Sequence, residues 1–452
     1  MKPRKYILPE RLCLFFILSI GASVCQPKDG ILGTVGGTDD GHDAGEATTG
    51  CPNSPGVTIS EHDTCTGRLA ASQFTNALCA CGNFQMGDVL TTRGFDSNQG
   101  VYLEGDPTDT GAPIGVNGNY TQFAGATDIG GSFSIAGGGP LQLMGALNVR
   151  GDFFSAGNVS VTGKTTVSRH AWLGGNFSGF GVLQVGGDLH YAGTIPPFTT
   201  LVSGTKYQQP VAVAKPCPCE ELVPIAALID AAKENNDNIH LGLESPEALA
   251  SVTGASRRTL SCGRGYLSRI EGIGSLAIHV TGNVALFIDG SIDLLGTLSF
   301  DVDPGAEIDV FVKGNLKVLG TLALANKNRP SAGRMWIDGT QSITLASPFI
   351  GNLYAPRAHV GALIGVEVWG AIFAGDFSAG TFARFFYDRA IQTAGASCPA
   401  PVPPAGVCTQ CQWCPGSSAC IDGLCGSCKS DSDCCSLSVC SSGHCQPLMV
   451  DP

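Results

Sequence analysis

Cysteine is the residue type whose number and spacing in this chain could most readily support chemistry. Three cysteine pairs have the CxxC spacing used by zinc sites, and two have the closer CxC spacing of some redox-active and metal-binding sites. These pairs are Cys408/Cys411, Cys411/Cys414, Cys425/Cys428, Cys79/Cys81 and Cys217/Cys219. Ten cysteines crowd into residues 408–445, a density at which disulfides hold a small module together. We therefore interpret the pairs as structural disulfides and predict no metal site and no cofactor.

Carboxylates near residue 300 suggest a second chemistry, the cleavage of glycosidic bonds. Asp301 and Asp303 share the outward side of one expected strand, and Glu307 follows closely. Many β-helix proteins cleave polysaccharides, and glycoside hydrolysis needs two carboxyl groups about 5–9.5 Å apart. One 24-residue period beyond Asp301, Asp303 and Asp309 stand Ala325, Lys327 and Gly333. Because the next coil does not reinforce the acids, we predict a solvated face and no enzyme. Asp301, Asp303 and Glu307 are the catalytic candidates of the alternative.

A short phrase that recurs at fixed intervals indicates which elements carry these residues. The stretch GSIDLLGTLSF begins at Gly290 and its variant GNLKVLGTLAL at Gly314, which gives a 24-residue period. Related openings recur at Gly351 and Gly375, and then at half that interval at Gly151, Gly163, Gly175 and Gly187. Such a period indicates one supersecondary unit stacked on copies of itself. Since the short glycine-bounded runs alternate apolar and polar residues, the sequence predicts an all-β, right-handed parallel β-helix, or β-solenoid.

The alternation of residues within one strand sets the register of this β-helix. The residues expected to face the core are Leu298, Phe300 and Val302, followed one period later by Leu322 and Leu324. A 24-residue coil then places Asp293 over Lys317 and Asp303 over Lys327, about 4.8 Å apart. Opposite charges on adjacent rungs attract each other, so the stacking and the alternation support the same coil.

Residues 216–265 interrupt the repeats and are predicted to form a short helical insertion. The segment PIAALIDAAKENND has the apolar spacing of one amphipathic helix of about three turns. Ser245, Pro246 and Glu247 give a second start signal, because serine caps a helix, proline fits its first position and acid suits its positive end. The cysteines expected to tie the insertion back are Cys217, Cys219 and Cys262.

The N-terminal residues have the pattern of an export signal. Residues 1–24 combine a basic start, an apolar run and small residues before a cleavage point, which predicts a signal peptide. Cys25 closes an imperfect bacterial lipobox and is predicted to be lipidated, with ordinary signal cleavage as the alternative. Residues 25–50 are predicted to be a flexible acidic tether, and residues 51–88 a cysteine-stapled cap that covers one end of the stack.

The other boundaries follow from the repeats and the cysteines. We predict β-helix in residues 89–215 and 266–397, a stiff proline-rich linker in 398–407, and a disulfide-rich module in 408–452. Once Cys13 leaves with the signal peptide and Cys25 is lipidated, an even number of cysteines is left to form disulfides, and their pairing is open. They are Cys51, Cys65, Cys79, Cys81, Cys217, Cys219, Cys262, Cys398, Cys408, Cys411, Cys414, Cys420, Cys425, Cys428, Cys434, Cys435, Cys440 and Cys445.

Two segments resemble known families. Residues 350–389 are similar to the C-terminal signature of a bacterial domain family of unknown function, found in exported, surface or pilus-associated proteins. The matching positions are Tyr354-Ala355-Pro356, Gly370-Ala371-Ile372 and Tyr387-Asp388. This resemblance implies a β-solenoid surface protein without known catalytic residues, and the short strands are also similar in architecture to bactofilins. The tail resembles a knottin-type module, although four additional cysteines depart from the six-cysteine pattern. The six are Cys420, Cys428, Cys434, Cys435, Cys440 and Cys445.

Together these features predict an exported structural or adhesive protein. The net charge of −12 disfavours nucleic acid and anionic lipid surfaces, so membrane contact is expected only through a lipid on Cys25. We predict a lipoprotein of the outer membrane or cell surface, or a secreted protein. Its β-helix shaft would present the cysteine-rich module to an envelope polysaccharide, a surface protein or its own copies. The alternatives are a polysaccharide lyase or glycosidase, and a ligand- or protease-binding tail.

Overall fold

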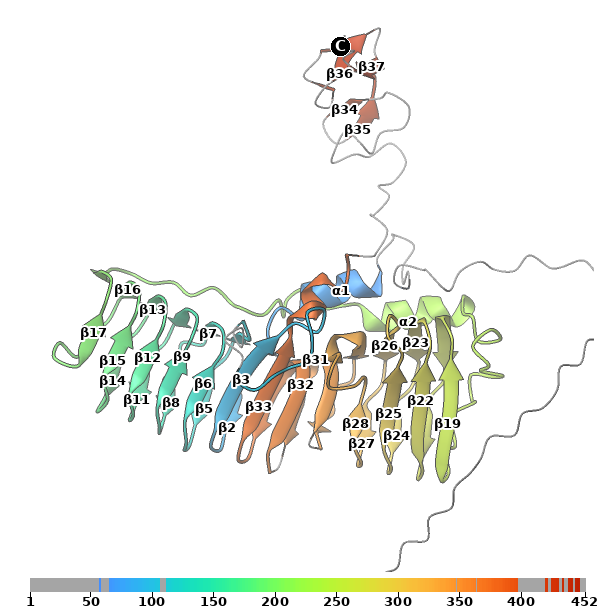
Figure 1. Ribbon diagram of the computed structural model, residues 1–452, viewed down its shortest axis with the longest axis horizontal. Coiled ribbons are helices and arrows are strands. Elements are labelled where there is room, and N and C mark those ends of the chain that lie inside the picture. Colours follow the sequence, from blue (N-terminus) through green and yellow to red (C-terminus); the bar gives the residue numbers. More distant parts are fainter. Residues whose placement is uncertain are drawn as a thin grey trace, which may run out of the picture. The chain divides into compact units, whose positions relative to one another are not determined.

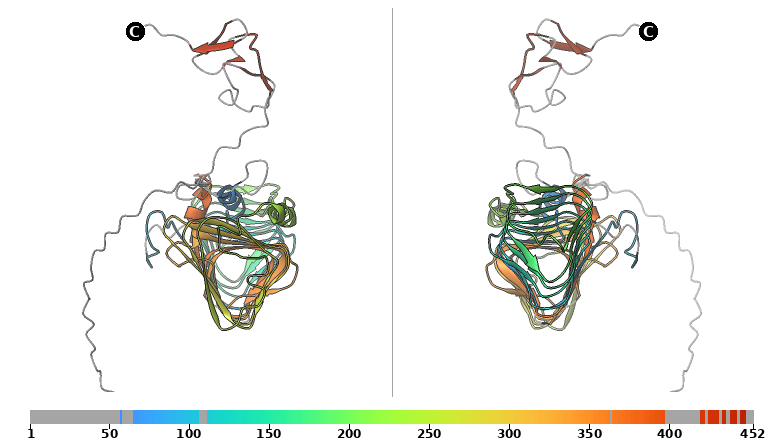
Figure 2. Two further views of the ribbon diagram at one scale, coloured as in Figure 1. Left: turned by 90° about the vertical axis from the view of Figure 1, so that its right-hand side faces the viewer. Right: turned by 90° about the vertical axis from the view of Figure 1, so that its left-hand side faces the viewer.

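The protein forms a parallel β-helix, as the repeats predict (Figure 1). The computed structural model describes residues 57, 65–105, 111–346, 348–362, 364–396 and parts of 419–447. Viewed along its axis, the β-helix is three-sided (Figure 2). The predicted signal peptide, the lipidation site at Cys25, the tether and the linker lie outside the described residues.

The first half of the β-helix consists of narrow coils built mostly from three-residue strands. Phe153 pairs with Ala171 and Ala171 with Leu189, so these coils have an 18-residue step. The glycines from Gly151 to Gly187 recur at two thirds of this step and therefore occupy every second corner of a three-sided coil. In most of these strands the outer two residues are buried and the middle one faces outward. The strands are β1 (Leu78–Ala80), β2 (Phe84–Met86), β3 (Leu90–Phe95), β4 (Ile114–Val116), β5 (Tyr120–Gln122), β6 (Thr127–Ile129), β7 (Phe133–Ile135), β8 (Leu141–Leu143), β9 (Leu147–Val149), β10 (Phe153–Ser155), β11 (Val159–Val161), β12 (Thr165–Val167), β13 (Ala171–Leu173), β14 (Phe177–Gly179), β15 (Leu183–Val185), β16 (Leu189–Tyr191), β17 (Thr200–Val202) and β18 (Lys206–Gln208).

The second half begins with wider coils, continues through two long strands, β31 and β32, and ends with the shorter strand β33. Leu298 pairs with Leu322, and Asp293 with Lys317, which confirms the predicted 24-residue step at this point. The strands are β19 (Ala255–Leu260), β20 (Gly263–Leu267), β21 (Ile270–Gly272), β22 (Ser275–Val280), β23 (Asn283–Ile288), β24 (Ile292–Leu294), β25 (Leu298–Val302), β26 (Glu307–Val312), β27 (Leu316–Val318), β28 (Leu322–Ala323), β29 (Gly333–Ile337), β30 (Ile343–Thr344), β31 (Phe349–Ala362), β32 (Val366–Ala379) and β33 (Ala383–Asp388).

The 24-residue step does not continue into the following coil. The prediction that Asp303 stacks on Lys327 is wrong, because β28 ends at Ala323 and the register is lost before that position. Ile308 pairs with Gly333, a 25-residue step, so Arg334 rather than Gly333 lies beside Asp309. The chain between β28 and β29 contains a 3-10 turn, η1 (Pro330–Ala332), and this connection accommodates the additional residue.

The order of the coils in space differs from their order along the chain. Leu78 of β1 pairs with Ile114 of β4 on one side and with Ile372 of β32 on the other. From β1 the chain winds outward to β18, returns along the β-helix, and starts the second half at the opposite end with β19 (Figure 1). It then winds back until β33 pairs with β3. The described strands within the predicted cap, β1 and β2, therefore lie in the middle of the stack and cap neither end.

The two ends of the stack are edge strands with exposed polar and basic residues. All three residues of β18 are exposed, including Lys206, and Arg257 and Arg258 lie on β19. Exposed charges on edge strands disfavour pairing with further strands. The exposed side chains of β18 and β19 thus disfavour the pairing of either end of this β-helix with strands of another molecule.

A continuous hydrophobic core runs through the coils. Leu298, Phe300 and Val302 are buried, and so are Leu322 and Leu324, which confirms the predicted inward set. Aromatic rings also stack from coil to coil inside the core. The ring centroids of Phe287 and Phe311 are 5.0 Å apart, and those of Phe311 and Trp336 are 5.7 Å apart. Each coil therefore packs its apolar side chains on those of the neighbouring coil.

Two α-helices lie along the same side of the β-helix, α1 (Thr66–Gln73) and α2 (Ile225–Glu234) (Figure 1). Helix α2 is the predicted amphipathic helix, with Ile225 and Ile229 buried. The helix predicted from Ser245 does not form, because backbone groups of this segment bond to the adjacent coil instead: the Pro246 carbonyl accepts a hydrogen bond from the Ser268 N–H. Tertiary pairing here overrides the local start signal. Among the described residues, no helix is long and apolar enough to cross a membrane.

Paired disulfides fasten the returning segment to the centre of the stack. Cys79 is bonded to Cys217 and Cys81 to Cys219, and each bond joins residues 138 positions apart. Cys65 and Cys262 are also disulfide-bonded.

The described parts of the tail form two antiparallel hairpins, one of β34 (Ala419–Ile421) and β35 (Leu424–Gly426), the other of β36 (Ser438–Ser441) and β37 (His444–Pro447). Disulfides join Cys428 to Cys440 and Cys434 to Cys445. Sulfur atoms of Cys428, Cys434 and Cys445 lie within 4.8 Å of one another, but all three belong to these disulfides. The knottin arrangement stays a prediction, because the side chains of eight further predicted disulfide cysteines lie outside the described part of the chain. They are Cys51, Cys398, Cys408, Cys411, Cys414, Cys420, Cys425 and Cys435.

Candidate functional site

The carboxylates considered for catalysis take part in separate contacts. Asp303 lies 2.9 Å from Nε2 of His279, and Asp301 is exposed beside His279 in the strand register. Glu307 accepts a hydrogen bond of 2.7 Å from Arg334. Two of the three candidates are thus engaged with basic side chains on different coils.

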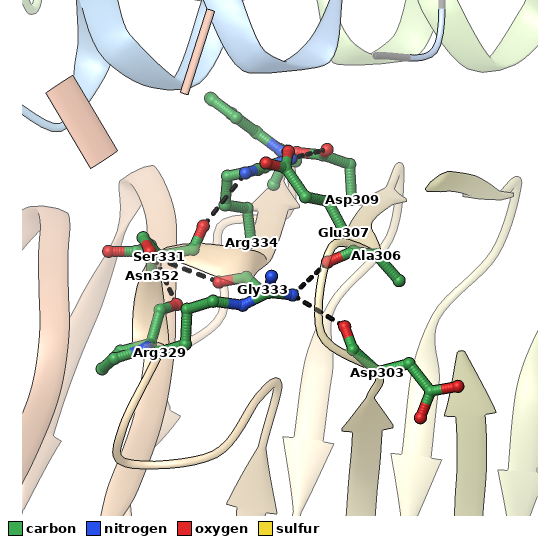
Figure 3. A network of polar contacts seen from close by, with 11 residues as sticks. Asp303, Ala306, Glu307, Asp309, Arg329, Ser331, Gly333, Arg334 and Asn352 are labelled. Carbon is green, nitrogen blue, oxygen red and sulfur yellow. Dashed lines mark hydrogen bonds and ion pairs between the residues drawn. The ribbon is translucent and has the colours of Figure 1, made fainter. Parts of the chain in front are cut away.

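Arg334 is the centre of a buried polar network that the sequence did not reveal (Figure 3). Its side chain is fully buried and donates two hydrogen bonds, of 2.8 and 2.5 Å, to the carboxylate of Asp309, which is 1% exposed. Trp336 also donates to Asp309, at 2.9 Å. Burial alone would lower the pKa of Arg334, but the charges of Asp309 and Glu307 outweigh it and raise the pKa. This network holds adjacent coils together.

The residues of the predicted family signature also have structural contacts. The Tyr354 hydroxyl accepts a hydrogen bond from the Val223 N–H, and the Tyr387 hydroxyl donates to the Phe74 carbonyl. Asp388 is buried and accepts three backbone N–H groups, from residues 97, 331 and 390. These three side chains thus join strands of the β-helix to the backbone of connecting segments outside the strands.

Gly370 turns a corner within the long strands. It has φ +124° and pairs with Gly351, at φ +120°. A Cβ atom on Gly370 would lie 2.1 Å from the Gly351 carbonyl oxygen. Glycine is required at this corner because other residues rarely adopt this φ and because the neighbouring strand leaves no space.

An open hollow of about 760 Å³ lies on the outer face of the β-helix. It lies near the middle of the stack, where β33 of the last coil in the chain pairs with β3 of the first. We call it the seam groove. Its floor is made by β3, β33 and β32, in which Arg93 pairs with Phe386 and Phe386 with Trp369. A second row alongside contains Thr91, Arg384 and Glu367. The groove is lined by Thr91, Arg93, Tyr102, Glu104, Gly105, Arg150, Glu367, Trp369, Arg384 and Phe386.

Three aromatic rings form the apolar part of the seam groove. Trp369 and Phe386 are stacked with their ring centroids 4.2 Å apart. Tyr102, from the loop after β3, contacts both rings edge-on, at 5.0 Å from Phe386 and 5.8 Å from Trp369. The amino group of Lys327 lies 4.9 Å from the Trp369 ring centroid. Among the described residues, the indole N–H of Trp369 is shielded and has no hydrogen-bond partner.

Charged side chains surround these rings. Arg93 pairs with Asp128 at 2.5 Å, and Arg384 pairs with Glu367 at 3.5 Å. Arg384 and Glu367 are partly exposed, so their ion pair is screened by solvent. An open aromatic surface bordered by guanidinium and carboxylate groups can bind a ligand that combines apolar faces with polar or charged substituents.

Sequence reasoning missed the seam groove. One signal was present: Trp369 and Phe386 both stand at outward positions, where the alternation places polar residues in most other strands. Their proximity to Arg93 and Tyr102 could not be inferred, because it depends on the pairing of β33 with β3, two strands from distant parts of the sequence.

Fold and site together define a parallel β-helix protein with an aromatic and arginine-lined surface groove. Residues 218–394 match the model of a family described as a domain of unknown function, DUF7305. This segment includes residues 350–389. The family signature predicted there, at residues 354–356, 370–372 and 387–388, stays a prediction. A crystal structure of an ice binding protein from an Antarctic bacterium, Flavobacteriaceae, is similar at 14% identity, covering 72% of this chain and 99% of that chain, with a TM-score of 0.20. None of the curated proteins matches this chain.

Proposed function

We propose that this protein is exported to the cell surface and binds a polysaccharide through the seam groove, in a structural or adhesive role. The observation that carries the proposal is the cluster of Trp369, Phe386 and Tyr102 among charged side chains in one open hollow. Sugar rings have apolar C–H faces that pack on aromatic rings. Their hydroxyl groups form hydrogen bonds with planar guanidinium and carboxylate groups.

The disulfides support the export part of the proposal. Bonds such as Cys79–Cys217 and Cys81–Cys219 persist in oxidising compartments and are rare in the cytosol of ordinary cells. Export agrees with the signal-like pattern of residues 1–24, and Cys25 is the residue expected to carry a lipid. Under this proposal the β-helix acts as a rigid carrier, and the cysteine-rich tail is a second, separately testable binding module.

Replacing Trp369 with alanine is expected to weaken polysaccharide binding at least about tenfold, as for a buried aromatic contact at a binding surface. The measurement is the affinity of the mature protein for immobilised dextran, xylan, alginate and polygalacturonate. The matched control is Trp172→Ala. Trp172 also lies on the outer face, stacked on Phe154 with the centroids 4.5 Å apart, but in the first half of the β-helix.

Equal loss of binding in both tryptophan variants would place the site elsewhere. If no polysaccharide of the panel binds the unmodified protein, the proposed function is wrong. If the protein releases new reducing ends from a polymer, the enzyme alternative takes its place.

Replacing Cys25 with alanine is expected to release the protein from the membrane fraction into the medium, because one thioether-linked lipid anchor is lost. Detergent phase partitioning of the two proteins measures this change. Partitioning that is unaffected by the substitution would leave signal cleavage without lipidation as the explanation.

A further inference from the structure

We infer that the polysaccharide bound in the seam groove is acidic, carrying carboxylate or sulfate groups, and that an adjoining arginine cleft recognises these groups. This inference rests on the proposed function. It concerns a second hollow of about 550 Å³ that shares Arg150 with the seam groove. We call this second hollow the arginine cleft.

Three arginines and a glycine-rich backbone form the arginine cleft. Arg150, Arg169 and Arg389 line it together with Gly111 and Gly130. Both glycines are closely packed: an added Cβ would lie 3.1 Å from Cδ of Arg389 at Gly111, and 2.6 Å from the Thr92 carbonyl oxygen at Gly130.

The charge of the two hollows contrasts with that of the whole chain. The protein has a net charge of −12, yet their lining contains five arginines and only two acids, Glu104 and Glu367. Two further acids lie close by: Asp128 contacts Arg93 and Arg150, and Asp152 contacts Arg169. Among the described residues that line or contact the two hollows, five arginines therefore face four acids.

The contacts made by Arg169 and Arg389 leave donors available for a ligand. Arg169 is 65% exposed, and its only described ion pair, to Asp152, measures 3.6 Å, beyond ordinary hydrogen-bond range. Arg389 donates one long hydrogen bond of 3.5 Å to the Phe95 carbonyl. A guanidinium group has five N–H donors, arranged in a fork that matches a carboxylate or sulfate. A polymer whose sugar rings pack in the seam groove can thus place an anionic group in the arginine cleft.

The experiment compares polygalacturonate with its fully methyl-esterified form, which has the same backbone without the charge. The mature protein is expected to bind polygalacturonate at least about tenfold more tightly, and its affinity should fall with added salt. Combined replacement of Arg169 and Arg389 by glutamine, two residues that line only the arginine cleft, is expected to remove this difference without affecting binding of the ester. The matched control is the combined replacement Arg257→Gln and Arg258→Gln, which removes the same charge from an edge strand.

Three outcomes would overturn the inference. The first is equal affinity of the protein for polygalacturonate and for its methyl ester. If the Trp369→Ala variant then binds neither polymer, the proposed function stands and only the preference for acidic polymers fails. The second is an equal loss in the control variant, which would show a general charge effect. The third is binding of neither polymer, in which case the proposed function fails as well. The comparison of the two polymers needs no variant, and the melting temperature of each variant shows whether it is folded.

Discussion

Replacing Asp309 with alanine is expected to lower the free energy of unfolding by about 3–5 kcal/mol, the loss typical of a broken buried ion pair. The substitution leaves the guanidinium of Arg334 buried without its principal counter-charge, and it removes the acceptor of the Trp336 indole N–H. Because Glu307 keeps its hydrogen bond to Arg334, we expect destabilisation of the fold without complete loss. Urea-induced unfolding of the mature protein with intact disulfides, followed by circular dichroism, measures this change.

The matched control is Lys317→Ala, which breaks the ion pair with Asp293 on the surface of adjacent coils. Both side chains are about half exposed, so this loss is expected to stay below about 0.5 kcal/mol. In a third variant, Asp309→Leu with Arg334→Met, both charges are removed together, and it should be more stable than Asp309→Ala. A loss below about 1 kcal/mol for Asp309→Ala would show that water or Glu307 compensates the arginine, contrary to the network described here.

Removing both central disulfides is expected to cost more than about 5 kcal/mol, whereas removing either one should cost only about 2 kcal/mol. Each bond closes a chain segment of 138 residues, which in chain-entropy terms restricts the unfolded state by about 5 kcal/mol. When one bond is cut, the other still closes the long segment, so only a short additional loop is released. The variants are Cys79→Ser with Cys217→Ser, Cys81→Ser with Cys219→Ser, and all four together, compared by urea unfolding.

The decisive quantity in this series is the departure from additivity. Two independent bonds would give a joint loss equal to the sum of the separate losses. The backbone of Cys217 also exchanges two hydrogen bonds with the Asn117 side chain, of 2.9 and 3.0 Å. These should hold the returning segment in place in either single-bond variant. Strict additivity would mean that the two bonds stabilise the protein by some means other than shared loop closure.

The features that could be predicted from the sequence are those set by neighbouring residues or by one repeat. Leu298 and Leu322 occupy corresponding places in adjacent coils, because alternation and period fix both the side and the step. Helix α2 was predictable from its own apolar spacing. The helix expected at Ser245 was not formed, since pairing with the adjacent coil satisfies the backbone there.

The features that could not be predicted depend on where the chain departs from its repeat. One additional residue between β28 and β29 moves Arg334 beside Asp309, so a strict 24-residue period hides the buried ion pair. The seam groove depends on the return of the chain to its starting coil, which no local pattern specifies. The carboxylates near residue 300 are close together in the sequence and therefore suggested a site. Trp369 and Phe386 did not, because they come together with Arg93 and Tyr102 only through the pairing of distant strands.

The pairing of β33 with β3 has a consequence for biosynthesis. When a ribosome has made only the first half of the protein, one side of β3 still has an unpaired strand edge, and it waits for residues 383–388 to be synthesised. Contacts so distant in sequence form late and slowly. A chain truncated before Ala383 would lack the closing strand and with it Arg384 and Phe386, so only a finished molecule contains the complete lining of the seam groove.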